Sequence, residues 1–154
     1  MGKTCFLIGH RESSDEFKAL LDEAIERHIT EYGVTDFVVG GYGGFDRLAR
    51  RALLDAKEEH PEIVLSLLVP YHPYDHPVEP PKGFDQTFYP PGMETVPKRA
   101  AIVRANQSMV SHSDFLIACV WHSVSNAKDL LEYARRWERR GLLHIQNLGE
   151  VKLS

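Results

Sequence analysis

The stretch that decides the fold is VVGGYGGFDRLA, residues 38–49. Apolar residues lead into a cluster of four glycines, and the cluster leads directly into a helical pattern. From Phe45 onward the apolar positions recur three and four residues apart, as on one helix face, at Leu48, Ala49, Ala52, Leu53 and Ala56. The pattern therefore predicts a strand, a glycine turn and a helix in succession.

Such a unit binds phosphate groups in many α/β proteins, because glycines let backbone N–H groups approach an anion at the partly positive start of a helix. We therefore expect a phosphate or ribose site at Gly40, Gly41, Gly43 and Gly44. The alternative is a tight turn that needs a positive φ and close packing of strand on helix. The motif lacks the Gly-Lys-Ser/Thr of a Walker loop and is a poor dinucleotide fingerprint.

Length and composition indicate one globular domain over residues 1–154. The net charge of −4 argues against a general nucleic-acid or membrane-surface binder, which needs a basic excess. No apolar run approaches the ~20 residues of a membrane span, and no signal-peptide pattern is present at the N-terminus. Cys5 and Cys119 lie in apolar runs, so we expect buried free thiols in a cytoplasmic protein.

Strand-like and helix-like segments alternate along the chain. Apolar runs predict strands at 4–9, 36–39, 63–69, 115–120 and 142–145, and helical patterns separate most of them. Gly141 is expected to end the last helix. Alternation of this kind predicts an α/β, three-layer Rossmann-like fold whose mainly parallel sheet has about five strands. We expect the strand at 115–120 to be central.

In a parallel sheet, ligands bind beyond the carboxyl ends of the strands. Polar, aromatic or glycine residues follow four of the predicted strands, whereas the loops at the opposite edge are plain connections. We therefore predict that these strand ends form the binding site, together with the glycine loop. The residues are Gly9, His10, Arg11, Asp46, Pro70, Tyr71, Trp121, Ser123, Ser125 and Asn126.

Several of these residues have a simpler interpretation as well. Asp46 either meets the dipole of its own helix or accepts a ribose hydroxyl, and these roles are compatible. Arg11 either binds a phosphate through two hydrogen bonds or is an ordinary surface arginine. Ser123, Ser125 and Asn126 either contact a ligand or cap the helix that follows them.

Residues 70–97 form a segment rich in proline and aromatic residues, and we expect a loop without clear secondary structure. A lid that stacks on a base is the preferred interpretation, and an oligomer contact is the alternative. The segment holds His72, Asp75 and His76, but no further ligand is evident, so we expect no metal site. We expect no cofactor, and a homodimer or higher homo-oligomer.

Four pieces of the sequence resemble the SLOG superfamily, the Rossmann-like group named for Smf/DprA and LOG proteins. They are FLIGHRE at 6–12, VVGGYGGFDRLA at 38–49, LLVPY at 67–71, and the segment from Arg104 through Met109 to SDFLIACVW. The chain is most similar to the small stand-alone YpsA-like members. The resemblance implies a cytosolic binder of nucleotides or ADP-ribose-like derivatives, and it favours Arg104 as a site residue.

LOG enzymes of this superfamily cleave the N-glycosidic bond of nucleoside monophosphates with a second glycine loop, PGGxGTxxE. This chain has VWHSVSNAKD at 120–129 instead, where only Asp129 falls near the position of the acid. Nucleotide binding is therefore the leading hypothesis, and an N-glycosidase or ribosyl-transfer enzyme is the alternative. The catalytic candidates are Asp46, Asp129 and Arg104. A protein-interaction module with a structural glycine loop is a third possibility.

Overall fold

The computed structural model describes residues 2–10, 15–41, 43–121 and 125–150. The predicted site residues Arg11 and Ser123 lie outside these ranges. Within these ranges the elements follow in the order β1 (Lys3–Gly9), η1 (Asp15–Phe17), α1 (Lys18–Thr30), β2 (Val34–Val39), α2 (Gly43–Glu59), β3 (Val64–Leu68), β4 (Gln86–Phe88), η2 (Met93–Thr95), η3 (Lys98–Ala100), α3 (Ala101–Ser111), β5 (Phe115–Cys119), α4 (Asn126–Arg139) and β6 (His144–Asn147).

The fold is α/β, as predicted, with one six-stranded sheet in the order β4-β3-β2-β1-β5-β6. All five strand pairs are parallel. Two predictions are wrong. The strand at 115–120 is not central, because β1 and β2 hold the middle of the sheet and β5 lies next to the edge strand β6. The proline-rich segment is not devoid of regular structure, because it contains β4 and η2.

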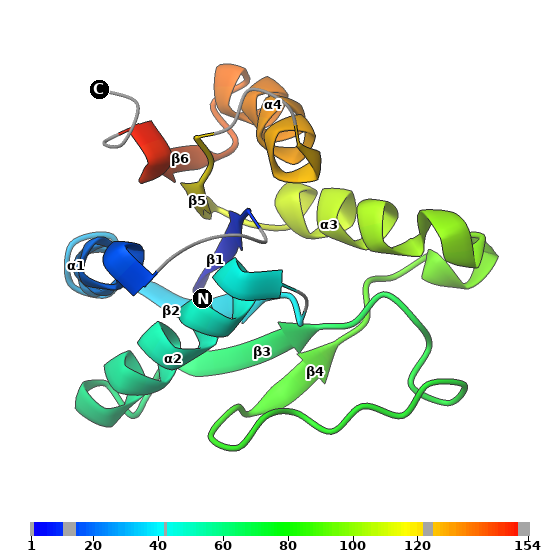
Figure 1. The fold of residues 1–154 in the computed structure, drawn as a ribbon, viewed down its shortest axis with the longest axis horizontal. Helices are drawn as coiled ribbons and strands as arrows, with labels where there is room; N and C mark the ends of the chain where they lie inside the picture. Colours follow the sequence, from blue (N-terminus) through cyan, green and yellow to red (C-terminus); the bar gives the residue numbers. More distant parts are fainter. Residues whose placement is uncertain (1, 11–14, 42, 122–124, 151–154) are drawn as a thin grey trace.

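Helices cover both faces of the sheet, with α1 and α2 on one side and α3 and α4 on the other (Figure 1). The strands alternate between these layers with the expected period of two. In β1, Cys5 and Leu7 face the α1/α2 layer, whereas Phe6 and Ile8 face the α3/α4 layer. Strands buried on both faces explain why their sequences are apolar almost throughout.

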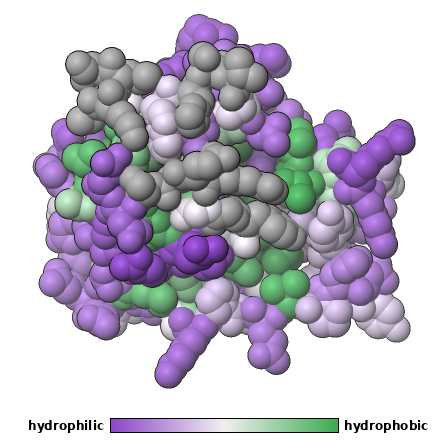
Figure 2. Space-filling model, viewed as in Figure 1, coloured by the Kyte–Doolittle hydropathy of each residue, from purple (hydrophilic) through white to green (hydrophobic). Residues whose placement is uncertain are grey.

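The helices present apolar stripes to these cores. The buried positions of α2 are Phe45, Leu48, Ala49, Ala52 and Leu53. Gly141 ends α4 as predicted, with a φ of +74° and an N–H that donates to the carbonyl oxygen of Glu138 at 2.9 Å. Hydrophilic residues dominate the rim of the face in Figure 2, and apolar residues are visible between them. Among the described residues, no helix is long and apolar enough to cross a bilayer.

The chain reverses its direction across the sheet between β1 and β5. It moves outward from β1 through β2 and β3 to β4, and α3 then returns it to the other side of β1. The carboxyl ends of neighbouring strands diverge at such a switch point and leave a crevice between their loops. This topology fixes where a ligand site is expected.

Candidate functional site

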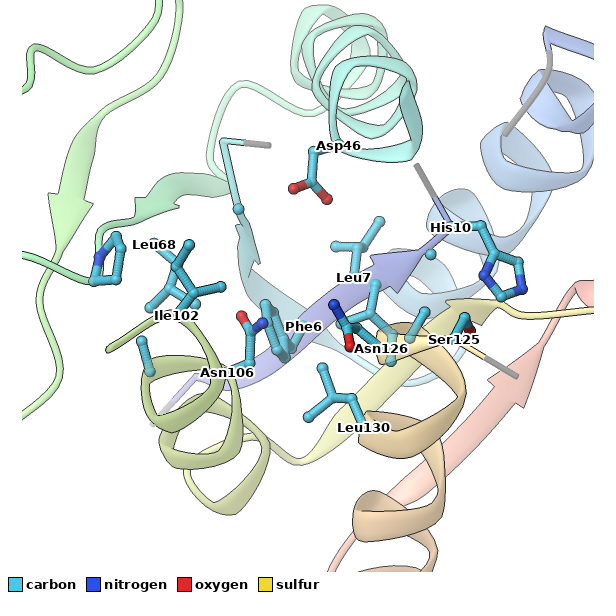
Figure 3. Close-up of a pocket in the computed structure, with 16 residues that line it drawn as sticks. Phe6, Leu7, His10, Asp46, Leu68, Ile102, Asn106, Ser125, Asn126 and Leu130 are labelled. Atoms are coloured by element: carbon cyan, nitrogen blue, oxygen red, sulfur yellow. The ribbon is translucent and has the colours of Figure 1, made fainter. Parts of the chain in front are cut away.

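A cavity of about 260 Å³ lies at the switch point. It is open to solvent between the ends of β1, β2 and β3 and the helices α3 and α4, and Figure 3 shows its lining. Its wall combines apolar side chains with five residues that carry polar side chains. The lining residues are Phe6, Leu7, Ile8, Gly9, His10, Gly40, Asp46, Leu68, Pro70, Ile102, Ala105, Asn106, Ser125, Asn126, Ala127 and Leu130.

Two of the predicted glycines allow the strand ends to approach the first turn of α2. A Cβ at Gly9 would lie 2.3 Å from Cγ of Phe45, and a Cβ at Gly40 would lie 2.9 Å from Oδ2 of Asp46. Neither glycine has a positive φ. Close packing of strand against helix, rather than an unusual backbone conformation, therefore requires glycine at position 9. At Gly40 the close atom is the end of the Asp46 side chain, which can rotate away.

Asp46 occupies the first turn of α2 and is half-buried. Its carboxylate points into the open space beyond the end of β1 (Figure 3). A carboxylate here is stabilised by the partial positive charge of the helix start, and it also presents acceptor oxygens to the cavity. Both interpretations of Asp46 from the sequence are compatible with its position.

The start of α4 forms the opposite wall of the cavity. Ser125 caps this helix, because its Oγ accepts a hydrogen bond from the backbone N–H of Lys128 at 3.0 Å. The capping interpretation of Ser125 is thus confirmed, although the residue also lines the cavity. Asn126 begins the helix, and its exposed side chain lies at the edge of the open space (Figure 3).

His10 connects the loops that follow β1 and β5. Its buried ring accepts a hydrogen bond at Nε2 from the backbone N–H of Trp121, at 2.9 Å. The backbone N–H of His10 donates to the carbonyl oxygen of Cys119 at 3.4 Å. His10 therefore shapes the cavity by holding two strand ends together, and Nε2 carries no proton in this arrangement.

Trp121 does not line the cavity. Its ring stacks on Phe17 with 5.0 Å between centroids and meets the edge of His10 at 4.5 Å. It packs against the α1/α2 core. A large aromatic side chain gains more from this burial than from the open crevice, so its role here is to support His10.

The structure also separates the two remaining catalytic candidates from the cavity. Arg104 is exposed on α3, and Asp129 is exposed in the first turn of α4. Neither belongs to the lining. Gly43 and Gly44 are the first two residues of α2, so they begin the helix rather than extend the loop.

Helix α3 also contributes to the cavity, which the sequence did not predict. Ile102, Ala105 and Asn106 line the cavity from this helix, and the Asn106 amide lies toward the open space (Figure 3). Ala101 and Ala105 are buried, and the helical repeat places residues 102 and 106 beside them on the same side. That face excludes Arg104.

A second cavity, of about 230 Å³, adjoins the first. The two share Leu68 and Pro70. The remaining lining is mostly apolar or aromatic: Gly41, Leu67, Val69, Tyr71, His76 and Val78. The rings of Tyr71 and His76 lie 5.0 Å apart in this lining. The proline-rich segment thus forms one wall of this second cavity.

The described lining of both cavities contains neither lysine nor arginine. Asp46 is its single carboxylate. Within that lining, positive potential therefore comes from backbone N–H groups and from the starts of α2 and α4.

His72, Asp75 and His76 do not converge as a group of metal ligands in the described structure. Nδ1 of His72 instead accepts the Tyr74 N–H at 3.0 Å.

Comparisons with known proteins give no family assignment. The sequence matches no protein-family model, and no curated protein matches it. The resemblance to the SLOG superfamily rests on the quoted motifs alone and stays a prediction.

Proposed function

We propose that the protein binds a nucleotide or an ADP-ribose-like derivative at the switch point of its sheet. The observation that carries the proposal is the cavity between the starts of α2 and α4, whose lining includes Gly40, Asp46 and Asn126. Dinucleotide and mononucleotide sites of α/β proteins occupy this place in the topology. The polar and apolar groups that line the two cavities support the proposal as well.

The first cavity suits a ribose and its phosphate. The Asp46 carboxylate offers acceptors to two hydroxyl groups, and the amides of Asn106 and Asn126 offer both donors and acceptors. The helix starts supply a favourable potential for an anion.

The second cavity suits the base. Its apolar wall and the rings of Tyr71 and His76 favour a flat aromatic group that is covered on both sides. Because Leu68 and Pro70 border both cavities, a base there remains within reach of a ribose at Asp46. This arrangement supports the interpretation of the proline-rich segment as a lid.

Binding is favoured over glycosidic cleavage. Glycosidases ordinarily use two carboxyl groups that flank the scissile bond. In the described lining Asp46 stands alone, and Asp129 is exposed outside the cavity. Cleavage of the N-glycosidic bond is therefore the competing outcome in the test below.

The test compares two carboxylates that share a helix environment. Asp46 and Asp129 each lie in the first turn of a helix, but only Asp46 faces the cavity. We expect isothermal titration with AMP and ADP-ribose to detect binding, Asp46→Asn to weaken it about tenfold or more, and Asp129→Asn to leave it unchanged. A hydrogen bond to a charged group is worth ~1.5–3 kcal/mol. Equal affinities in all three proteins would refute the proposal.

The same three proteins, incubated with AMP or NAD and assayed for free base, separate a binder from an enzyme. We expect no turnover with AMP or NAD. Rapid release of base that is lost in Asp46→Asn would instead establish a glycosidase with a single essential carboxylate.

We also propose that the protein is cytoplasmic and forms a homodimer or higher homo-oligomer. The buried free thiols of Cys5 and Cys119 are compatible with a reducing compartment. Light scattering coupled to size-exclusion chromatography measures the oligomeric state. A molar mass equal to that of one chain at micromolar concentration would refute the proposed homo-oligomer.

A further inference from the structure

Three metal-ligating side chains converge far from the cavity. Glu26 of α1 and Glu59 and His60 at the end of α2 each offer one ligand atom, and these atoms lie within 4.8 Å of one another. The 17 residues of α2 extend roughly 25 Å at a rise of ~1.5 Å per residue. Since α2 begins beside the cavity, the cluster lies near the amino-terminal edge of the sheet.

His60 is held in one orientation. Its Nε2 lies 3.0 and 2.8 Å from the two carboxylate oxygens of Glu26, and its Nδ1 lies 3.7 Å from Oε1 of Glu62. Backbone hydrogen bonds fix the same residue, because its N–H donates to Ala56 and its carbonyl accepts from Ile63. The Glu62 contact is too long for a hydrogen bond, so the Glu26 carboxylate and the backbone are what hold the imidazole.

The cluster carries an excess of negative charge. Among the described residues, neither Glu26, Glu59 nor Glu62 forms an ion pair with lysine or arginine. An ion pair between His60 and Glu26 explains why these two side chains lie together. It does not involve Glu59, which forms no ion pair with any residue that the structure describes. A divalent cation between the three ligand atoms offsets the charge of all of them.

We propose that Glu26, Glu59 and His60 form a binding site for one Zn²⁺-like divalent ion, with water completing its coordination. One imidazole with carboxylates suits Zn²⁺ better than Ca²⁺ or Mg²⁺, which prefer oxygen ligands alone. Tetrahedral Zn²⁺ binds its ligands at ~2.0–2.2 Å. Binding would therefore require Nε2 of His60 and Oε2 of Glu26, which are 2.8 Å apart, to separate by roughly 0.6 Å. The ion then links α1 to α2.

The test uses tag-free protein, because an affinity tag of histidines binds the same ions. Zn²⁺ is titrated in competition with a chromophoric chelator, and equilibrium dialysis gives the stoichiometry. We expect one ion per chain. Glu59→Gln is expected to weaken Zn²⁺ binding about tenfold or more without changing the Tm of the metal-free protein, because Glu59 forms no ion pair in the described structure.

His60→Asn removes the nitrogen ligand, and His112→Asn is its matched control. His112 is an exposed histidine at the end of α3, outside the cluster. We expect His60→Asn to abolish the intense visible bands of bound Co²⁺ and His112→Asn to retain them. Wild-type affinity in both Glu59→Gln and His60→Asn, or failure of the wild-type protein to bind Zn²⁺ at millimolar concentration, would overturn the proposal.

Discussion

Replacing Gly9 with alanine tests the contact on which the geometry of the cavity depends. The added methyl group would lie 2.3, 2.5 and 2.8 Å from three ring carbons of Phe45. Phe45 is buried at 1% exposure, so packing leaves no space for another rotamer about its Cα–Cβ bond, and rotation of the ring about Cβ–Cγ does not move Cγ. The start of α2 must move away from β1.

Overpacking of this kind costs ~1–3 kcal/mol, and we expect about 2–3 kcal/mol because three atoms clash at once. Urea unfolding measures the change. Gly41→Ala is the matched control, since its methyl group meets only Cδ1 of Leu67 at an ordinary 3.7 Å. The cost in Gly9→Ala should fall by at least about 1 kcal/mol when Phe45→Ala is also present, because this second change removes Cγ, Cδ1 and Cδ2. A Gly9→Ala protein within about 0.5 kcal/mol of wild type, or strict additivity with Phe45→Ala, would refute the reasoning.

Three further predictions concern stability. Asn147→Ala should cost about 2–3 kcal/mol in urea unfolding, because the Asn147 side chain bonds both the N–H and the carbonyl of buried Val120, at 2.9 and 3.0 Å; a cost below about 0.5 kcal/mol would contradict this role. Burial lowers the pKa of His28, so the unfolded chain takes up a proton that the folded chain does not. Stability should therefore fall below pH ~6.5 by up to ~1.4 kcal/mol per pH unit, and His28→Leu should remove that slope; an unchanged slope would exclude His28 as its source. The hydrogen bond from the Leu65 N–H, with smaller contributions from Lys57, lowers the pKa of Asp85. Its contribution should be present above pH ~4 and be lost as the pH falls through the lowered pKa. Since the Asp85 side chain is 39% exposed, we expect Asp85→Ala to cost only ~1 kcal/mol at neutral pH; equal pH profiles for variant and wild type below pH 4 would contradict the assignment.

The sequence predicts the elements of this fold better than their arrangement. Apolar runs and glycine punctuation identify β1, β2, β3 and β5, because strands buried on both faces need apolar side chains throughout. The apolar runs do not determine the order of the strands in the sheet. The run at 115–120 was therefore predicted to be central, although β5 lies beside the edge strand β6. The three residues of β4 were also missed, since pairing with β3 rather than local propensity makes them a strand.

The same distinction applies to the site. Gly9, Gly40 and Asp46 were predictable because strand ends of a parallel sheet meet at one edge, and the structure places all three in the cavity lining. Asn106 was not predicted, because the face that α3 turns toward the cavity depends on how Ala101 and Ala105 pack against the sheet. Local sequence around Asn106 resembles that of any amphipathic helix.

The central claim is that a nucleotide-like ligand occupies the switch-point cavity. Amide chemical-shift mapping with ADP-ribose and AMP tests it most directly, since the measurement locates the ligand without assuming an activity. We predict saturable shifts at the backbone amides of Gly9, Gly40 and Asp46 and at the side-chain amides of Asn106 and Asn126. Shifts confined to other surfaces, or none at millimolar ligand, would contradict the account.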